Sequence, residues 1–504
     1  MFNVMRGFAI ICLLAASGLS AQEINVKEHT LSNGMRVLLV ERPGKPTIGT
    51  AWATRVGSVN EAPGISGLAH FFEHLMFKGS WTIGTQDPQK DAALNVEQDR
   101  LFAEIQKEMQ ILRLKQRRGE IADADDPAAR SPHLEELLAE FDKVVKAQQD
   151  LLVKGEFDTL YTQVGAPGTN AFTSEDVTCY VLTIPANALE FYCWMESDRL
   201  KSPAFREFYA EREVVSEERR LGENNPTDAL DKAFNAMIWQ TMPYHMDVIG
   251  VPADFNAITR DKATAYFKTY YAPNNLTLAL VGGFKADEVI PLLERYFGRI
   301  PANPVPPPEM VITEPPQPGE KRIIGEADAP PSATLLHKTV AVGHRDEAAL
   351  EVLASVLNGR SGRLTQSLVI DQKIATEASA TSNAMKYAGE FWLSGTVADG
   401  HTPAEVEQAM EKEIEKVREK GITELELEKA KNQIHTRRYS MLRNDMALAI
   451  QLATVDTFAG YRTFLDQPAA VDRVTAADVQ RVAKTYFNPQ TRNVALYTRK
   501  KAAQ

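Results

Sequence analysis

The first regular pattern along the chain is an alternation of apolar and polar residues. It runs through positions 36–41 and 47–56, and the turn-forming stretches SNG (32–34) and RPGKP (42–46) bound the first run. A two-residue period places alternate side chains on opposite faces, so we predict antiparallel strands at 36–41 and 47–56. The spacing of apolar residues then becomes helical, which predicts a helix over 66–77.

A long charged stretch, residues 88–154, carries two further helical patterns. Ser131 followed by Pro132 has the residue types of an N-cap and a first helical position, and Gly155 ends the second pattern. Two consecutive helices of this kind predict a helical hairpin or short coiled coil inserted into the first half of the chain. The insertion is either a solvated structural element or a lid or partner-docking element, and the sequence leaves both interpretations open.

Strand and helix patterns resume after this insertion. A strand is predicted at 178–184 and a helix at 188–200, with helical spacing continuing to about Gly222. Proline is then dense over 299–321, a composition typical of an extended, stiff linker.

The two halves on either side of this linker resemble each other. Residues 258–282 and 474–498 align without gaps. Each shows a capped helix, Lys-Thr-Tyr and an aromatic residue, a proline two positions later, and a strand rich in β-forming residues. We therefore predict two pseudo-repeated α+β domains, 22–298 and 322–504, each with helices on one face of a mostly antiparallel sheet.

Composition narrows the class of protein. A chain of 504 residues is longer than one hydrophobic core usually organises, which agrees with two domains. The formal net charge of −11 argues against a nucleic-acid-binding protein. Beyond residue 21 the only cysteines are Cys179 and Cys193, which excludes a disulfide framework and a cysteine-based metal site.

Residues 1–21 have the composition of a secretory signal peptide. Arg6 lies near the start, an apolar run follows over 8–19, and Ala21 stands at a plausible cleavage point. The run is shorter than the roughly 20 residues that span a bilayer, so an uncleaved membrane anchor is the less favoured alternative. We expect an exported protein without a stable membrane anchor, periplasmic in a Gram-negative bacterium.

The stretch GISGLAHFFEHLMFKGS, residues 64–80, carries the candidate chemistry. His70 and His74 are four residues apart and share a helix face, and Glu73 lies at the edge of that face. Two ordinary histidines with buried hydrogen bonds are one interpretation. Three polar groups on an apolar helix need compensation, however, and a zinc ion would supply it. Glu73 would then be a general base, and His-x-x-Glu-His is the inverzincin signature.

The corresponding helix of the second half reads DEAALEVLASVLNGR and contains no histidine. The chain therefore has two related domains but one candidate metal site. We predict one zinc ion per chain, in the N-terminal domain.

Four longer stretches resemble the pitrilysin family of inverzincin zinc metallopeptidases, most nearly the branch of mitochondrial processing peptidase and its bacterial relatives. They are LSNGMRVLLVE, RVGSVNEAPGISGLAHFFEHLMFKGS, GTNAFTSEDVTCYVLTIP and EREVVSEERR. The resemblance implies Glu218 as the third zinc ligand, with Glu211 seven residues earlier as the support of a zinc-bound histidine. It also implies that Asn170 and Ala171 belong to an edge strand on which an extended peptide adds as a further strand.

The resemblance implies a zinc-dependent endopeptidase that hydrolyses peptides or unfolded segments in a chamber between clamshell halves, with Glu73 taking a proton from the attacking water. The alternative is a non-catalytic peptide-binding or scaffolding subunit. Active members also hold the substrate with an arginine and a tyrosine of the C-terminal domain, whereas the corresponding stretch here, 387–403, has no arginine. We therefore expect a homologous partner subunit that supplies the Arg/Tyr pair, with a homodimer as the alternative.

Overall fold

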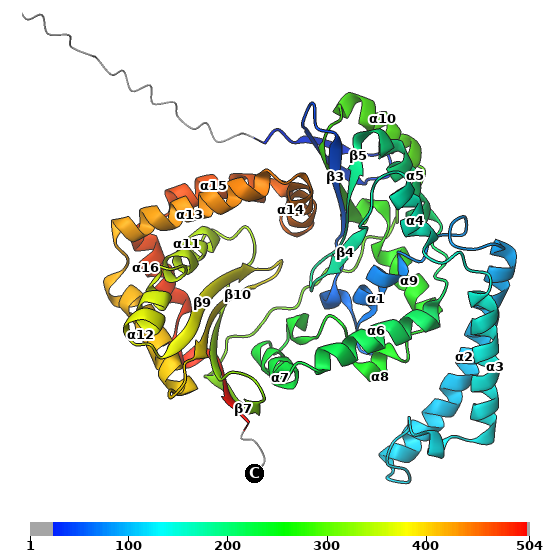
Figure 1. Ribbon diagram of the computed structural model, residues 1–504, viewed down its shortest axis with the longest axis horizontal. Coiled ribbons are helices and arrows are strands. Elements are labelled where there is room, and N and C mark those ends of the chain that lie inside the picture. The colour runs from blue at the N-terminus through cyan, green and yellow to red at the C-terminus, as the bar shows by residue number, and fades with distance from the viewer. Residues whose placement is uncertain (1–23, 501–504) are drawn as a thin grey trace, which may run out of the picture.

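The structure is a computed structural model that describes residues 24–500. The predicted signal peptide, 1–21, lies outside the described residues. The described chain forms two α+β halves, each around its own sheet (Figure 1). The predicted fold class is therefore confirmed.

The first half is built on a six-stranded sheet. Its strands follow the order β1 (Lys27–Thr30), β2 (Arg36–Glu41), β6 (Leu276–Gly282), β3 (Thr47–Thr54), β5 (Thr178–Pro185) and β4 (Asn170–Thr173). Only the β2–β6 pair is parallel, and the other pairs are antiparallel. The strands predicted at 36–41, 47–56 and 178–184 correspond to β2, β3 and β5.

The second half repeats this sheet without a counterpart of β1. Its order is β7 (Lys321–Ala327), β11 (Asn493–Arg499), β8 (Ser332–Thr339), β10 (Gly389–Val397) and β9 (Ala375–Ala384). Again one pair, β7–β11, is parallel. Strand by strand, β2-β6-β3-β5-β4 corresponds to β7-β11-β8-β10-β9.

The aligned segments of the two halves form the same local structure. Helix α9 (Arg260–Tyr270) leads into β6, and α16 (Ala476–Tyr486) leads into β11. Both helices begin after a threonine whose side chain accepts a backbone N–H, Thr259 and Thr475. The shared pattern in the sequence thus marks a repeat of structure.

Helices of the first half cover one face of its sheet. They are α1 (Leu68–Leu75), α5 (Leu189–Lys201), α6 (Phe208–Glu223), α8 (Pro252–Phe255), α9 and α10 (Ala286–Tyr296). Their apolar side chains join Trp52 and Tyr180 of the sheet in one core that includes Phe71 and Phe72 of α1. A short helix that the sequence pattern did not reveal, α4 (Glu156–Gln163), adds Phe157 to this core.

The inserted residues form a helical hairpin that projects from the first half (Figure 1). Helix α2 (Pro88–Arg117) begins after Asp87, and α3 (Pro132–Gln149) begins after Ser131, as its sequence predicts. The two helices enclose a small apolar core of their own. At the root of the hairpin, backbone hydrogen bonds join residues 84–86 to 151–153.

The second half has its own helical cover. Helices α11 (Glu347–Leu357), α12 (Pro403–Lys420), α13 (Glu424–Leu442), α15 (Tyr461–Arg473) and α16 surround its core, with a π-helical turn at Thr365–Asp371. None of the described helices is long and apolar enough to cross a membrane.

One helix of each half packs against the sheet of the other half. Helix α14 (Asp445–Phe458) of the second half packs Leu448 and Leu452 on the face of the first sheet opposite α1. Helix α7 (Asp228–Ile238) of the first half packs Phe234 and Ile238 against the second sheet. Asp456 of α14 is buried in the first half and accepts hydrogen bonds from two arginines there. The exchange fixes the halves relative to each other.

The proline-rich stretch between α10 and β7 contains no helix or strand in the described chain. Glu314 anchors it to both halves. Its carboxylate accepts backbone N–H groups of residues 240–242 in the first half and the Lys338 ammonium in the second. The linker therefore runs as a strap across the two halves.

Candidate metal centre and peptide-binding edge

Helix α1 is fixed at its start by a buried carboxylate. The backbone N–H groups of Gly67 and Ala69 donate to Glu61 at 2.7 and 2.6 Å. Burial raises the pKa of Glu61 to about 8, although these hydrogen bonds oppose the shift. Gly67 has φ +86° and lies so close to the Ile249 carbonyl that a Cβ atom would be 2.5 Å from it. Phe71 and Phe72 face the core, so the polar face of the helix points away from it.

Helix α6 is held in place from its buried side. The Arg212 guanidinium donates to the carbonyls of Asn256 and Ile258 at 2.9 and 3.2 Å and lies over the rings of Phe102 and Tyr209. Burial lowers the pKa of Arg212 to about 10. These contacts fix the rotation of α6 about its axis and hence the face that its glutamates present to α1.

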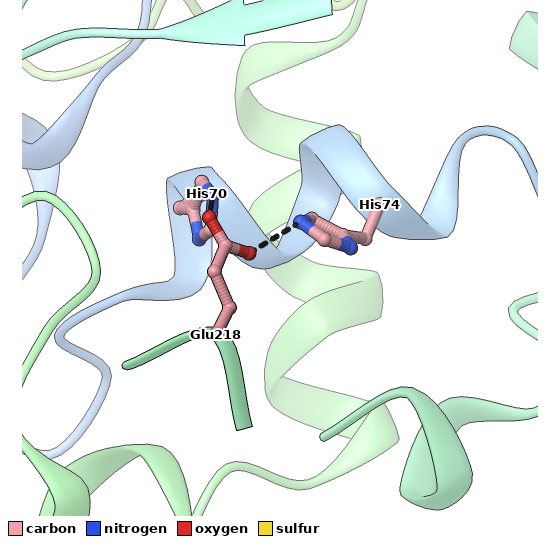
Figure 2. A group of neighbouring side chains, drawn as sticks. All are labelled: His70, His74 and Glu218. Carbon is pink, nitrogen blue, oxygen red and sulfur yellow. Dashed lines mark ion pairs between the residues drawn. The ribbon is translucent and has the colours of Figure 1, made fainter. Parts of the chain in front are cut away.

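His70, His74 and Glu218 converge between these two helices. Figure 2 shows both imidazoles on one side of α1 with the Glu218 carboxylate directed between them. Glu218 oxygens lie 3.7 Å from His70 Nε2 and 3.3 Å from His74 Nε2, and one ligand atom from each residue lies within 4.8 Å of the others. Ligands about 2.1 Å from a tetrahedral zinc are separated by roughly 3.4 Å, so this donor set fits zinc.

A second carboxylate supports His74 from behind. Glu211 Oε1 lies 3.1 Å from His74 Nδ1, and Lys78 donates to the other Glu211 oxygen at 2.5 Å. Burial raises the pKa of Glu211, but the hydrogen bonds from His74 and Lys78 outweigh it, and the net pKa is lowered. An ionised Glu211 holds the Nδ1 proton of His74 and so directs Nε2 toward the metal position.

The two histidines differ in their surroundings. Burial and then the neighbouring His74 lower the pKa of His70, and its Nδ1 is buried without a hydrogen-bond partner among the described residues. Burial also lowers the pKa of His74, but the neighbouring carboxylates, Glu211 first, raise it overall. The structure thus gives His74 an orienting partner and leaves His70 to be oriented by packing.

Glu73 lies beside this group and not within it. Its carboxylate accepts a hydrogen bond of 2.7 Å from the Thr173 hydroxyl of β4. Glu217, the neighbour of Glu218, instead pairs with Arg220 at 2.8 Å on the exposed side of α6. One glutamate of α6 therefore faces the histidines, and the adjacent one faces solvent.

A cavity of about 380 Å³ opens next to the metal position. Its lining includes Glu73 and His74 of α1. Asn170 and Ala171 also line it. Both belong to β4, which ends the sheet and pairs only with β5, so its other backbone edge is available. Residues 152–158, which lead out of the helical hairpin, also contribute to the lining.

Sequence reasoning missed two contributors to this site. Lys78 follows His74 by four residues, a spacing that could have placed it on the same side of the chain as the histidines. Thr173 carries no comparable local signal, because it reaches Glu73 across a separation of 100 residues.

Comparisons with known proteins agree with this fold. Residues 36–115 match the profile described as insulinase (peptidase family M16), and residues 257–434 match the peptidase M16 inactive domain. The zinc protease PqqE of Helicobacter pylori is 26% identical over 508 residues, covering 96% of this chain and 97% of that protein.

Solved structures show the same arrangement. A protease from Helicobacter pylori superposes with a TM-score of 0.76 at 22% identity, over 94% of this chain and 100% of that one. Pitrilysin superposes with a TM-score of 0.69 at 17% identity, and this chain spans 45% of its length.

The chain belongs to the M16 peptidase family, that of pitrilysin. The predicted family is thus confirmed. The similarity to named zinc proteases supports a peptidase-family role with zinc, and the finer assignments are proposals.

Proposed function

We propose that this protein is a zinc-dependent endopeptidase, or the zinc-bearing subunit of one, that hydrolyses peptides or unfolded segments. The observation that carries the proposal is the convergence of His70, His74 and Glu218, with Glu73 beside them and outside the ligand set. A purely structural metal site would have no use for this fourth side chain. A non-catalytic subunit is the second candidate function, and it would not require all four of these side chains.

His70, His74 and Glu218 would hold the zinc, which when bound supplies a Lewis acid that acidifies water and polarises the scissile carbonyl. Glu73 takes the proton of the attacking water and delivers it to the leaving amine. Asn170 and Ala171 present the free edge of β4 to the extended peptide, whose backbone pairs with it as an added strand.

The variant Glu73→Gln tests this assignment. The neutral amide keeps the size of the side chain but removes the base, so peptide hydrolysis falls by at least about a hundredfold while zinc content stays near one per chain. Zinc is measured by elemental analysis and cleavage with a quenched fluorescent peptide library. A variant that retains hydrolysis removes Glu73 as the base. A wild-type protein that binds zinc and peptide without cleaving, even with any copurifying partner chain present, favours the non-catalytic subunit.

The same proposal includes an exported, periplasmic location and a homologous partner subunit that supplies an Arg/Tyr pair. The partner subunit is supported by the absence of arginine from residues 387–403. These residues form the end of the β9–β10 hairpin, β10 and the approach to α12. Purification from the native host, with copurifying chains identified by mass spectrometry, tests the partner. Full peptidase activity of the isolated chain would contradict it, and a symmetric dimer would favour the homodimer.

A further inference from the structure

The hydroxyl of Thr173 connects the candidate base to the strand that faces the cavity. Its Oγ1 donates to Glu73 Oε2 at 2.7 Å, and this is the only hydrogen bond that the Glu73 carboxylate accepts from residues 24–500. One carboxylate oxygen is thereby held by β4. The other is left for the reacting water.

Thr173 is itself rigidly mounted. It pairs in register with the buried Thr178 of β5, and the Ser174 N–H closes the hairpin by donating to the Val177 carbonyl at 2.8 Å. The loop beyond is fixed by the Val59 N–H, which donates to the Glu175 carbonyl at 3.0 Å. A β-branched side chain has restricted χ1, so the hydroxyl keeps its direction when the backbone is fixed.

The position of Thr173 links two parts of the site. Ala171, two residues earlier on the same strand, lines the cavity next to Glu73. A peptide that adds to the free edge of β4 is therefore aligned by the same short strand that holds the base through Thr173. The terminal torsion of a glutamate is broad, so a single fixed donor narrows the orientations of its carboxylate substantially.

We propose that Thr173 is a positioning residue. Its hydroxyl fixes the Glu73 carboxylate against the edge strand β4, so that the base keeps a constant position relative to a peptide paired with that strand. The inference rests on the proposed peptidase function. It assigns Thr173 no contact with the metal and no proton transfer of its own.

The variants Thr173→Val and Thr173→Ser test this role in the full-length, zinc-loaded protein. Valine keeps the shape but removes the donor, so kcat falls about 10- to 100-fold while KM stays within about twofold. Zinc content and the melting temperature stay near the wild-type values. Serine retains the hydroxyl and restores kcat to within about threefold. Thr183→Val, at an exposed position of the neighbouring strand β5, is the matched control and leaves kcat unchanged.

Several results would overturn the proposal. They are a kcat within twofold of wild type for Thr173→Val, a serine variant no better than the valine variant, loss of zinc from the valine variant, or an effect confined to KM. The last result would place Thr173 in peptide docking alone.

A double-mutant cycle separates this inference from the proposed function. Thr173→Val, Glu73→Leu and the double variant are compared by chemical unfolding, a measurement that needs no cleavage. A hydrogen bond between the two side chains makes the effects on the unfolding equilibrium constant non-multiplicative by more than about twofold. If the wild-type protein, assayed together with any copurifying partner chain, cleaves nothing but the cycle shows coupling, the proposed function fails and the contact stands. Multiplicative effects would remove the contact itself.

Discussion

Helices α1 and α11 occupy corresponding places in the two halves but have opposite surroundings. In α11, almost every side chain is buried among the other helices of the second half, and Ser355 is its one buried polar residue. In α1, Phe71 and Phe72 are buried, whereas His70, Glu73 and His74 are partly exposed toward α6 and the cavity. In a repeated fold, one copy of the helix thus serves packing alone, while the other presents a face of titratable side chains.

The difference depends on what lies opposite each helix. Helix α6 brings Glu211 and Glu218 to α1, and β4 brings Thr173. The helices around α11 bring mainly apolar side chains, and their polar side-chain contacts to it include those of two glutamines, Gln433 and Gln467. The polar face of α1 is therefore compensated by partners that α11 does not have.

The sharpest test removes Glu218, the proposed zinc ligand of α6. We expect Glu218→Gln to lose zinc and to reduce peptide hydrolysis by more than about a thousandfold, because the metal supplies several kcal/mol of transition-state stabilisation. Elemental analysis and the peptide assay measure both losses. The control is Glu217→Gln, whose side chain pairs with Arg220 in solvent and whose change should leave zinc and rate near wild type. Equal losses in the two variants would contradict the assignment of Glu218, and not Glu217, to the face of α6 that meets the histidines.

The second test changes a buried residue of α11. Leu353 of α11 is fully buried, so Leu353→Ala leaves a cavity and lowers the free energy of unfolding by about 2–5 kcal/mol. Denaturant unfolding measures the loss. Zinc content below the melting temperature should not change, because α11 contributes no ligand. Zinc loss under native conditions would show that the second half supports the metal site directly.

A smaller effect on zinc binding is expected from removing the carboxylate that supports His74. Glu211→Gln removes the charge that orients the His74 imidazole and pairs with Lys78. We expect zinc affinity to fall about 10- to 100-fold, as is usual when a supporting carboxylate of a metal site is lost. Competition with a fluorescent chelator measures the affinity. An unchanged affinity would mean that packing alone orients His74.

The smallest effect concerns the strap between the halves. Lysine and backbone donors outweigh burial and lower the pKa of Glu314 to about 2, below its usual value near 4.5. Its contribution to stability is therefore complete above about pH 4.5 and is lost as the pH falls through about 2. Glu314→Gln should cost about 1–2 kcal/mol at pH 7, and the difference from wild type should vanish near pH 2. A difference that persists at pH 2 would exclude charge as its cause.

Much of the fold could be predicted because its signals are local. The alternation at β2 and β3, the Ser131-Pro132 start of α3 and the shared Lys-Thr-Tyr and proline of the repeats each act over a few residues. The break between α5 and α6 was less accessible, because Phe205 and Glu207 adopt positive φ values of 44° and 54° that their residue types disfavour.

The sequence by itself determined the pair of histidines of the proposed zinc site. A spacing of four residues places His70 and His74 on one helix face whatever surrounds the helix. The family resemblance named Glu218 and Glu211, but only the tertiary structure decided how they lie. It shows that Glu218 faces the histidines while Glu217 faces solvent, that Glu211 reaches His74, and that Thr173 holds Glu73. Those contacts join residues 100 or more positions apart, and their geometry depends on how α6 and β4 pack against α1. Local periodicity carries no information about that packing.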